Sequence, residues 1–362
     1  MQLNTHPRGS ALVARILYGV SPIGLGHATR SLVLSAELKR RGAEVRFFSG
    51  GKAAEFIRDR GFAVDDIVED PVPHVSNGEM SRVALWYVRS WVANRRTVPR
   101  TLRVMDVYRP DLVVCDEEFT GIIAAGDRNV KRVFIADELS LGFARTWIAR
   151  KLEARVDRWY RGLQASVDLL LVPEHGVDEG NRRFVGPIVR ATTRSPAETR
   201  KAYGLPAGRM VLFATSGSGL GREFALRVRD SLGAAGLVGV CLAVTGNRGR
   251  KIEGEGVYDL GVVPDNQNLV AAADLVVSTA GKSTIDEAAA AGTPIIALPI
   301  RHHAEQERNA AALGYTHDDS SNLPELIRKK IGMRQPPQRF SGELAAAVAI
   351  LSLFGGDRAE AG

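Results

Sequence analysis

The residues best placed to do chemistry lie in the stretch 274–309. A short apolar run, residues 274–278, predicts a strand, and the small residues after it mark the point where a helix must begin. The start of a helix exposes backbone N–H groups and the positive end of the helix dipole, which suit phosphate oxygens. We therefore predict a diphosphate site at this turn, formed by Gly281, Lys282, Ser283 and Thr284.

Further polar side chains follow in the same stretch. Glu287 lies one turn inside the expected helix, where its carboxylate could accept hydrogen bonds from a ribose. The next expected strand, residues 294–298, leads into a polar loop at its carboxyl end, where open α/β sheets bind ligands. The polar residues of this loop and of the helix after it are His302, Glu305, Gln306 and Asn309. Together these groups outline a nucleotide-diphosphate site.

A glycine loop near the N-terminus forms a second candidate site. Gly24 and Gly26 follow the first expected strand, residues 12–20, and let the backbone pass close to a ligand. His27 then falls at the start of a helix, beside the carboxyl end of that strand. Its imidazole suits a general base, because an unperturbed pKa near ~6.5 leaves it mostly neutral at pH 7. A capping or packing role for His27 is the alternative.

The stretch 274–309 resembles the donor half of nucleotide-sugar glycosyltransferases of the GT-B fold, most nearly family 28, whose type member makes lipid II. The family pattern of Gly, a Glu six residues later, Gly-x-Pro, Pro, a His/Gln-rich loop and Asn-Ala is met in order. The matching residues are Gly281, Glu287, Gly292-Thr293-Pro294, Pro299, His302, Gln306 and Asn309-Ala310. The loop after Pro299 is one residue shorter than in the lipid II enzyme. The Gly-x-Gly-His string also resembles both glycosyltransferases of this fold and nucleotide-sugar hydrolases, in which the His is the expected base.

This resemblance implies an α/β protein with two Rossmann-like domains facing across a cleft, with Gly24 and Gly26 on the acceptor side. It implies that a second glycine loop, of Ser216, Gly217, Ser218 and Gly219, faces the donor diphosphate, and that backbone near Val263 reads the base. It also implies Asp116, at the end of the expected strand 111–115, as the partner that holds the His27 tautomer. A turn or cap role for Asp116 is the alternative.

Composition and length fit two soluble domains. The chain has 362 residues, 45% of them hydrophobic and 25% charged, which exceeds most single domains and allows substantial cores. No apolar run approaches the ~20 residues that span a bilayer, and no secretory pattern is visible. The two cysteines lie far apart in apolar runs, which predicts buried thiols in a reducing compartment. Cys and His show no metal-ligand spacing, and no Asp-x-Asp motif occurs.

Strand-like and helix-like segments alternate along the chain, which is typical of parallel α/β layers. We expect an N-terminal acceptor domain over residues 11–188 and a C-terminal donor domain over residues 195–340. The second domain opens with a predicted capping box, in which Ser195 is the N-cap and Glu198 is the third helical residue. Residues 341–354 predict a helix that, by the resemblance, packs back on the first domain.

The positive charge is concentrated in two segments. The formal charge is +7, yet residues 79–108 and 143–163 each have six basic against two acidic residues, and they contain all four Trp. Arg-rich amphipathic helices with Trp suit an anionic membrane surface, where each basic residue adds about 1 kcal/mol. The alternative is that their apolar stripes pack internally and the arginines are only solvated. Nucleic acid is less favoured, because neither segment lies in a recognisable nucleic-acid module.

We therefore predict an inverting, metal-independent glycosyltransferase that transfers a hexose from a nucleotide sugar to an acceptor hydroxyl. A UDP-sugar is the favoured donor. The acceptor is lipid-linked if the basic segments bind membrane. No metal or cofactor is expected besides the donor substrate. The predicted location is cytoplasmic, peripheral on the inner face of the membrane. Two alternatives stay open: a nucleotide-sugar hydrolase that uses water at His27, and a non-enzymatic membrane or nucleic-acid binding protein.

Overall fold

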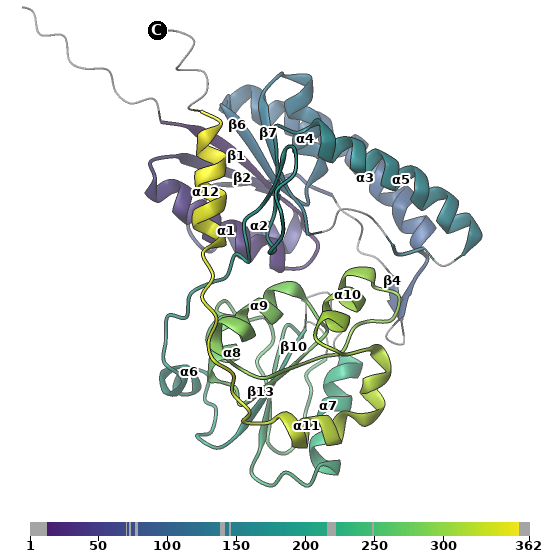
Figure 1. Cartoon of the computed structure of the whole chain (residues 1–362), viewed down its shortest axis with the longest axis vertical. Coiled ribbons are helices and arrows are strands. Elements are labelled where there is room, and N and C mark those ends of the chain that lie inside the picture. Colours follow the sequence, from purple (N-terminus) through teal and green to yellow (C-terminus); the bar gives the residue numbers. More distant parts are fainter. Residues whose placement is uncertain are drawn as a thin grey trace, which may run out of the picture.

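The computed structural model describes residues 13–69, 71, 74–76, 79–137, 142–144, 146–215, 222–247 and 250–354. Within these residues the chain forms two α/β domains stacked along the long axis of the molecule, the first built on a seven-stranded and the second on a five-stranded sheet (Figure 1). Both sheets are parallel, and their central strands are buried apolar runs because helices cover both faces.

The first sheet has the strand order β3-β2-β1-β6-β7-β8-β9. Its strands are β1 (Arg15–Val20), β2 (Glu44–Ser49), β3 (Val64–Asp66), β6 (Leu112–Asp116), β7 (Lys131–Ile135), β8 (Leu169–Val172) and β9 (Arg182–Phe184). The strand order reverses between β1 and β6, which makes the carboxyl ends of these two strands the topological switch point. Open α/β sheets bind ligands in the crevice at such a point, so the fold itself directs attention to the residues after β1 and β6.

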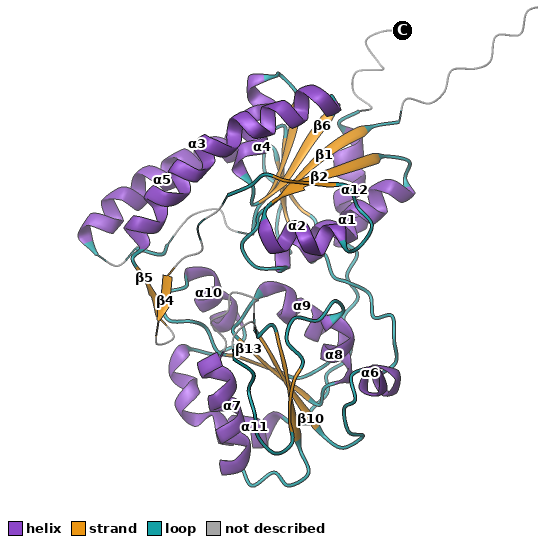
Figure 2. Cartoon of the chain, turned by 180° about the vertical axis from the view of Figure 1, so that it is seen from behind, coloured by secondary structure: helices purple, strands orange, loops and turns teal. Residues whose placement is uncertain are grey.

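The helices of this domain include a projecting pair. They are α1 (Gly26–Arg40), α2 (Gly51–Arg58), α3 (Val83–Tyr108), α4 (Phe119–Asp127) and α5 (Trp147–Ser166), with a small hairpin of β4 (His74–Ser76) and β5 (Glu79–Ser81) before α3. Helices α3 and α5 extend well beyond the sheet and pack against each other (Figure 2). Near their amino ends Val83 and Tyr87 form a small core of their own with Leu152 and Val156.

The second sheet has the order β12-β11-β10-β13-β14. Its strands are β10 (Met210–Ala214), β11 (Cys241–Thr245), β12 (Val257–Asp259), β13 (Leu275–Ser278) and β14 (Ile295–Ala297). Its helices are α6 (Pro196–Ala202), α7 (Arg222–Ala234), α8 (Asn266–Ala272), α9 (Lys282–Ala291), α10 (Ala304–Ala312) and α11 (Leu323–Lys330), with a 3-10 turn, η1 (His317–Asn322), before α11. This sheet reverses its order between β10 and β13, and α9 begins directly after β13.

The chain crosses between the domains twice, and the two crossings touch. The last helix, α12 (Gly342–Ser352), packs against α1, where Ala346, Ala347 and Ile350 are fully buried in the first domain's core (Figure 1). A Cβ added to Gly342 would lie 2.3 Å from the carbonyl oxygen of Gly186, so only glycine fits at this contact. The close packing of the two crossings fixes how α12 returns to the first domain.

Candidate active site

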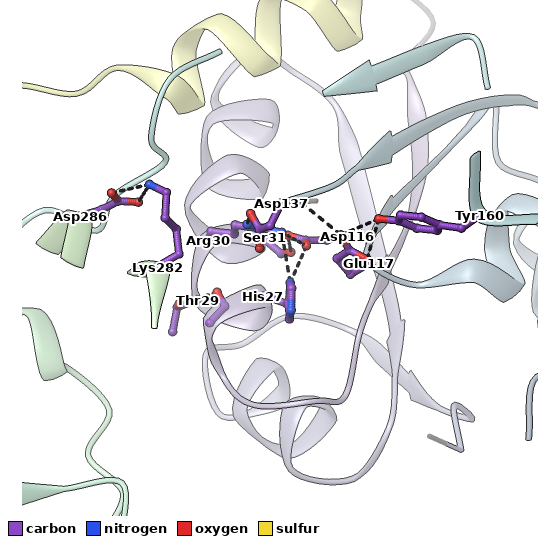
Figure 3. Close-up of polar contacts among 11 residues, drawn as sticks. His27, Thr29, Arg30, Ser31, Asp116, Glu117, Asp137, Tyr160, Lys282 and Asp286 are labelled. Atoms are coloured by element: carbon purple, nitrogen blue, oxygen red, sulfur yellow. Dashed lines mark hydrogen bonds and ion pairs between the residues drawn. The ribbon is translucent and has the colours of Figure 1, made fainter. Parts of the chain in front are cut away.

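His27 and Asp116 meet at the switch point of the first sheet. His27 is the second residue of α1, Asp116 is the last residue of β6, and the His27 Nδ1 lies 2.9 Å from the Asp116 Oδ1 (Figure 3). Asp116 is fully buried, whereas 21% of the His27 side chain is exposed. Because a carboxylate can only accept, Nδ1 must carry the proton, and the lone pair of the imidazole is then on Nε2. This is the tautomer that a general base requires.

Arg30 and Ser31 hold the Asp116 carboxylate from the next turn of α1. The Arg30 Nε donates to Asp116 Oδ2 at 2.7 Å, its Nη2 donates to Asp116 Oδ1, and the Ser31 hydroxyl donates to Oδ2 at 3.0 Å. The Arg30 Nη1 also pairs with Asp137, just after β7 (Figure 3). Neither Arg30 nor Asp137 was predicted from the sequence as a site residue. The i, i+3 spacing from His27 to Arg30, which puts both on one helix face, is the signal that could have found Arg30.

These contacts set the ionisation of the pair. Burial raises the pKa of Asp116, but the charge and hydrogen bonds of Arg30 outweigh it and hold that pKa well below its ordinary range. Burial lowers the pKa of His27, but the hydrogen bond and charge of Asp116 outweigh it, so the net shift is upward. Asp116 is therefore ionised, and it stabilises an imidazolium once His27 takes up a proton.

Glu117 places a second acid beside this pair. Its φ of 47° is in the left-handed region, an unusual backbone conformation for a residue other than glycine. The Tyr160 hydroxyl donates to Glu117 Oε1 at 3.1 Å, and so does the backbone N–H of Asp137 at 3.1 Å. Burial raises the pKa of Glu117 to about 8, so the group is mostly protonated at neutral pH. Nothing in the residues around Glu117 predicts this conformation.

The start of α9, from the second domain, lies directly against the start of α1. A Cβ added to Gly26 would lie 3.0 Å from the Ser283 hydroxyl oxygen, so the first domain's glycine loop approaches α9 closely. Gly24 has a φ of 72°, which explains the first glycine of the loop. His27, Gly24, Gly26 and Ser283 are thereby brought to one place between the domains.

The amino end of α9 is open. Its N-cap is Gly281, which has no side chain, and among the described residues no side-chain cap of this helix is found. The Lys282 ammonium donates to both carboxylate oxygens of Asp286 at 2.6 and 2.7 Å, one turn further along the helix (Figure 3). Asn309 fixes the turn before the helix, because its side-chain amide donates to the carbonyl oxygen of Ala280 at 3.1 Å. An uncapped helix start with a lysine beside it is a suitable anion site.

Other predicted donor residues lie in different surroundings. Oε1 of the buried Glu287, the predicted ribose ligand, accepts two hydrogen bonds from Arg190, at 2.9 and 2.7 Å. Because Arg190 lies in the linker between the domains, these bonds tie the linker to Glu287. The buried Gln306 accepts from the Ile300 backbone at 3.0 Å and shapes the polar loop. His302 has a φ of 67° within that loop.

Two further predictions concern residues of the second domain away from α9. Val263 is buried in the second domain's core. The predicted diphosphate loop of Ser216, Gly217, Ser218 and Gly219 lies outside the described residues.

Glu305, from α10, also belongs to the surroundings of His27. Burial raises its pKa, and Asp137, His27 and Arg30 of the first domain all act on it electrostatically. Nearby, the rings of Phe143 and His303 meet edge to face across the domains, with centroids 5.7 Å apart. The site therefore draws on β6, α1 and the segment after β7 on one side, and on α9 and α10 on the other.

Comparison with protein families agrees with this division. Residues 14–142 match the family "Glycosyl transferase family 1", and residues 249–320 match the family "Glycosyltransferase family 28 C-terminal domain". The first match contains the His27–Asp116 pair and the second contains α9 and α10. The two halves of the site thus lie in the two matched regions.

Individual proteins extend the likeness over nearly the whole chain. An uncharacterized glycosyltransferase of Methanosarcina acetivorans is 24% identical over 94% of this chain and 97% of its own. A UDP-N-acetylglucosamine–N-acetylmuramyl-(pentapeptide) pyrophosphoryl-undecaprenol N-acetylglucosamine transferase of Mycobacterium avium is 24% identical over 90% and 82%.

Solved structures share the fold over a similar extent. The kitacinnamycin glycotransferase, 18% identical, superposes with a TM-score of 0.64 over 96% of this chain and 99% of its own. A spinosyn rhamnosyltransferase solved with thymidine diphosphate, 19% identical, has a TM-score of 0.59 over 93% and 95%. The predicted architecture of two Rossmann-like domains is confirmed. With the family matches, these likenesses identify the chain as a glycosyltransferase of the GT-B fold whose second domain is similar to glycosyltransferase family 28.

Proposed function

We propose that this glycosyltransferase is an inverting, metal-independent hexosyltransferase that uses a nucleotide diphosphate sugar, with a UDP-sugar favoured, and a lipid-linked acceptor. The main observation behind the proposal is that a base of the correct tautomer, His27, lies where the open amino end of α9 meets α1. A base from one domain thus faces an anion site from the other, which is the arrangement that sugar transfer needs.

The proposed reaction is a single displacement. The Nε2 of His27 takes the proton of the acceptor hydroxyl as its oxygen forms a bond to the anomeric carbon of the donor sugar. The bond from that carbon to the diphosphate breaks at the same time, and the electron pair leaves with the diphosphate oxygen. Because the acceptor enters opposite the leaving group, the configuration at the anomeric carbon inverts. Asp116 stabilises the imidazolium that results.

The α9 terminus would receive the negative charge of the leaving group. Backbone N–H groups in its first turn and the Lys282 ammonium offer fixed positive charge to the diphosphate, and such preorganised groups stabilise developing charge. Lys282 would then be shared between Asp286 and the donor. Glu287, held by Arg190, offers its carboxylate to the ribose. This arrangement supports a reaction without a divalent ion, and undiminished activity in excess EDTA is the test.

The acceptor proposal rests on the surface of the projecting helices. On α3, Leu85, Val88 and Trp91 form an exposed stripe at three-residue spacing, and Trp91 is 58% exposed. At the start of α5, Trp147 is 68% exposed, and the Lys151 ammonium lies 4.0 Å from its ring centroid. Exposed Trp among arginines suits an anionic membrane interface. The relative from Mycobacterium avium, by its name, acts on an undecaprenol-linked substrate, which supports the same acceptor class.

Membrane association by this surface would be peripheral. Among the helices that the structure describes, none is both long and apolar enough to cross a bilayer. The two projecting helices would instead lie on the surface and hold the His27 site near a lipid-linked hydroxyl.

A donor screen tests the proposed function. The full chain is incubated with radiolabelled UDP- and dTDP-sugars and a membrane lipid extract, and the label is followed into the organic phase. We expect one donor to label the lipid, and His27→Ala to abolish that labelling. If label stays aqueous with every donor, the lipid acceptor is wrong. If free sugar appears equally fast without any acceptor, the enzyme is a hydrolase and the transferase assignment fails.

A further inference from the structure

The Arg30 guanidinium is bonded to both aspartates beside His27. It donates to Asp116 through two nitrogens and to Asp137 through the third, although Asp116 and Asp137 follow different strands of the sheet. Its Nη2 also lies 3.1 Å from the Nδ1 of His27. Arg30 and Asp137 are nearly buried, with side chains 8% and 12% exposed. Charges this poorly solvated act strongly on one another.

The short approach of Arg30 to His27 has a defined chemical meaning. The Nδ1 of His27 carries a proton and donates to Asp116, so Nδ1 cannot accept a hydrogen bond from the Arg30 Nη2. The Nδ1 and the Nη2 therefore lie side by side because both donate to the same oxygen of Asp116. A guanidinium in this place opposes protonation of the imidazole, while Asp116 and Asp137 favour it. The charge balance on His27 therefore depends on Arg30.

We propose that Arg30 is a positioning residue: it locks Asp116 in the orientation that holds the His27 tautomer, and its positive charge opposes protonation of the imidazole before the acceptor proton arrives. A base that is already protonated cannot accept that proton. Two buried carboxylates without a neighbouring cation would leave the imidazole charged before the acceptor binds. Arg30 thus supplies the cation that offsets Asp116 and Asp137.

Other groups also face His27, and they are taken into account. Glu117, beside Asp116 at the end of β6, and Glu305, on α10, both interact with the imidazole. Burial raises the pKa of both, and to about 8 for Glu117, so Glu117 is mostly protonated at neutral pH and adds little negative charge there. Apart from Asp116, whose hydrogen bond and charge act on His27 more strongly, Arg30 and Asp137 are the described charged groups whose removal should change the charge balance on His27, in opposite directions.

This inference rests on the proposed role of His27 as the base, but its test does not need activity. The full chain, labelled in its histidines, is titrated by NMR without ligands, and the pKa of His27 is assigned by its absence in His27→Ala. We expect Arg30→Gln to raise the His27 pKa by about 1 unit or more and Asp137→Asn to lower it. Arg40→Gln, the same change on the same helix at an exposed residue paired with Glu37, should leave it unmoved.

The opposite signs distinguish the proposal from a purely structural role. If both substitutions leave the His27 pKa unchanged, or move it in the same direction, Arg30 does not control the base and the inference is overturned. Should Arg30→Gln not fold, Asp137→Asn decides alone, because asparagine keeps the shape of the side chain and an oxygen that can accept from Arg30.

Activity then separates this inference from the proposed function. In an active enzyme, the acidic limb of the kcat/KM profile for Arg30→Gln should move to higher pH together with the NMR titration. Shifts of the NMR titration in a protein that transfers no sugar would support the inference and refute the proposed function. Sugar transfer by the parent enzyme, with no shift of the His27 titration in the variants, would support the proposed function and refute the inference.

Discussion

Replacing Asp116 by asparagine removes one charge from the centre of the site and keeps its shape. One oxygen of Asp116 receives His27 and Arg30, and the other receives Arg30 and Ser31. In asparagine one of these positions becomes an NH₂ group, which points a donor at an Arg30 N–H in either orientation. If the NH₂ group takes the first position, the His27 Nδ1 must accept from it, and the proton moves to Nε2, where it blocks the base.

The size of the effect follows from this geometry. A positioned general base contributes about 10²- to 10⁴-fold, so we expect kcat to fall by that factor, or about 3 to 5 kcal/mol in the barrier. Donor affinity should change little, because the proposed diphosphate site is on α9 of the other domain. Neutralising a buried, paired carboxylate also costs about 3 to 5 kcal/mol of folding stability, so unfolding must be measured separately.

The assay compares kcat at saturating donor and acceptor with donor affinity by calorimetry, on protein shown to be folded by circular dichroism. The matched control is Asp111→Asn, directly before the opposite end of β6, where the carboxylate accepts from the Arg15 backbone N–H at 2.8 Å. It should keep near-parental kcat. A folded Asp116→Asn variant with kcat within about threefold of the parent would refute the reasoning about the His27 tautomer.

Three further results are expected. Lys282→Met should raise the donor KM or Kd about tenfold, the effect of losing one charge-assisted contact, and unchanged donor affinity would exclude Lys282 from the diphosphate site. Glu117→Gln tests a linkage: the pKa of the native glutamate, about 8, lies above its ordinary value, so the parent loses stability as pH rises from about 4.5 to about 8. As pH rises from 5 to 9, the free energy of unfolding of the variant should increase by about 1 to 3 kcal/mol relative to that of the parent, as measured by urea unfolding. Parallel curves of unfolding free energy against pH for the two proteins would contradict this. The double variant Trp91→Ala, Trp147→Ala should bind anionic vesicles at least tenfold more weakly than the parent. The control Val238→Ala, at a side chain 99% exposed on the second domain, should bind as the parent does. If the double variant also binds as the parent does, α3 and α5 do not form a membrane surface.

Local patterns predicted those parts of the molecule that depend on nearby residues. The capping box of Ser195 and Glu198 is confirmed, because both partners lie within one helical turn. The turn before α9 and the histidine at the start of α1 could be found because small residues between a strand and a helix leave a recognisable spacing. Asp116 could be named because the resemblance pairs the histidine with an aspartate at a strand end, and Asp116 follows an apolar run that predicts such a strand.

Contacts that depend on chain path could not be predicted in this way. Arg30 reaches Asp137 over 107 residues, which requires knowing that β6 and β7 are neighbours. Arg190 reaches Glu287 only because the linker folds back on the second domain, and nothing in its irregular sequence indicates that route. The left-handed conformation of Glu117 is likewise imposed by its surroundings, because glutamate has no preference for it.

The central claim is that the donor diphosphate binds at the start of α9, facing His27 of the other domain. A crystal structure of the full chain with UDP or dTDP bound tests it most directly. We expect phosphate oxygens within hydrogen-bond distance of backbone N–H groups in the first turn of α9, with the terminal phosphate on the side of the His27 Nε2. A nucleotide bound elsewhere, or phosphates turned away from the imidazole, would contradict it.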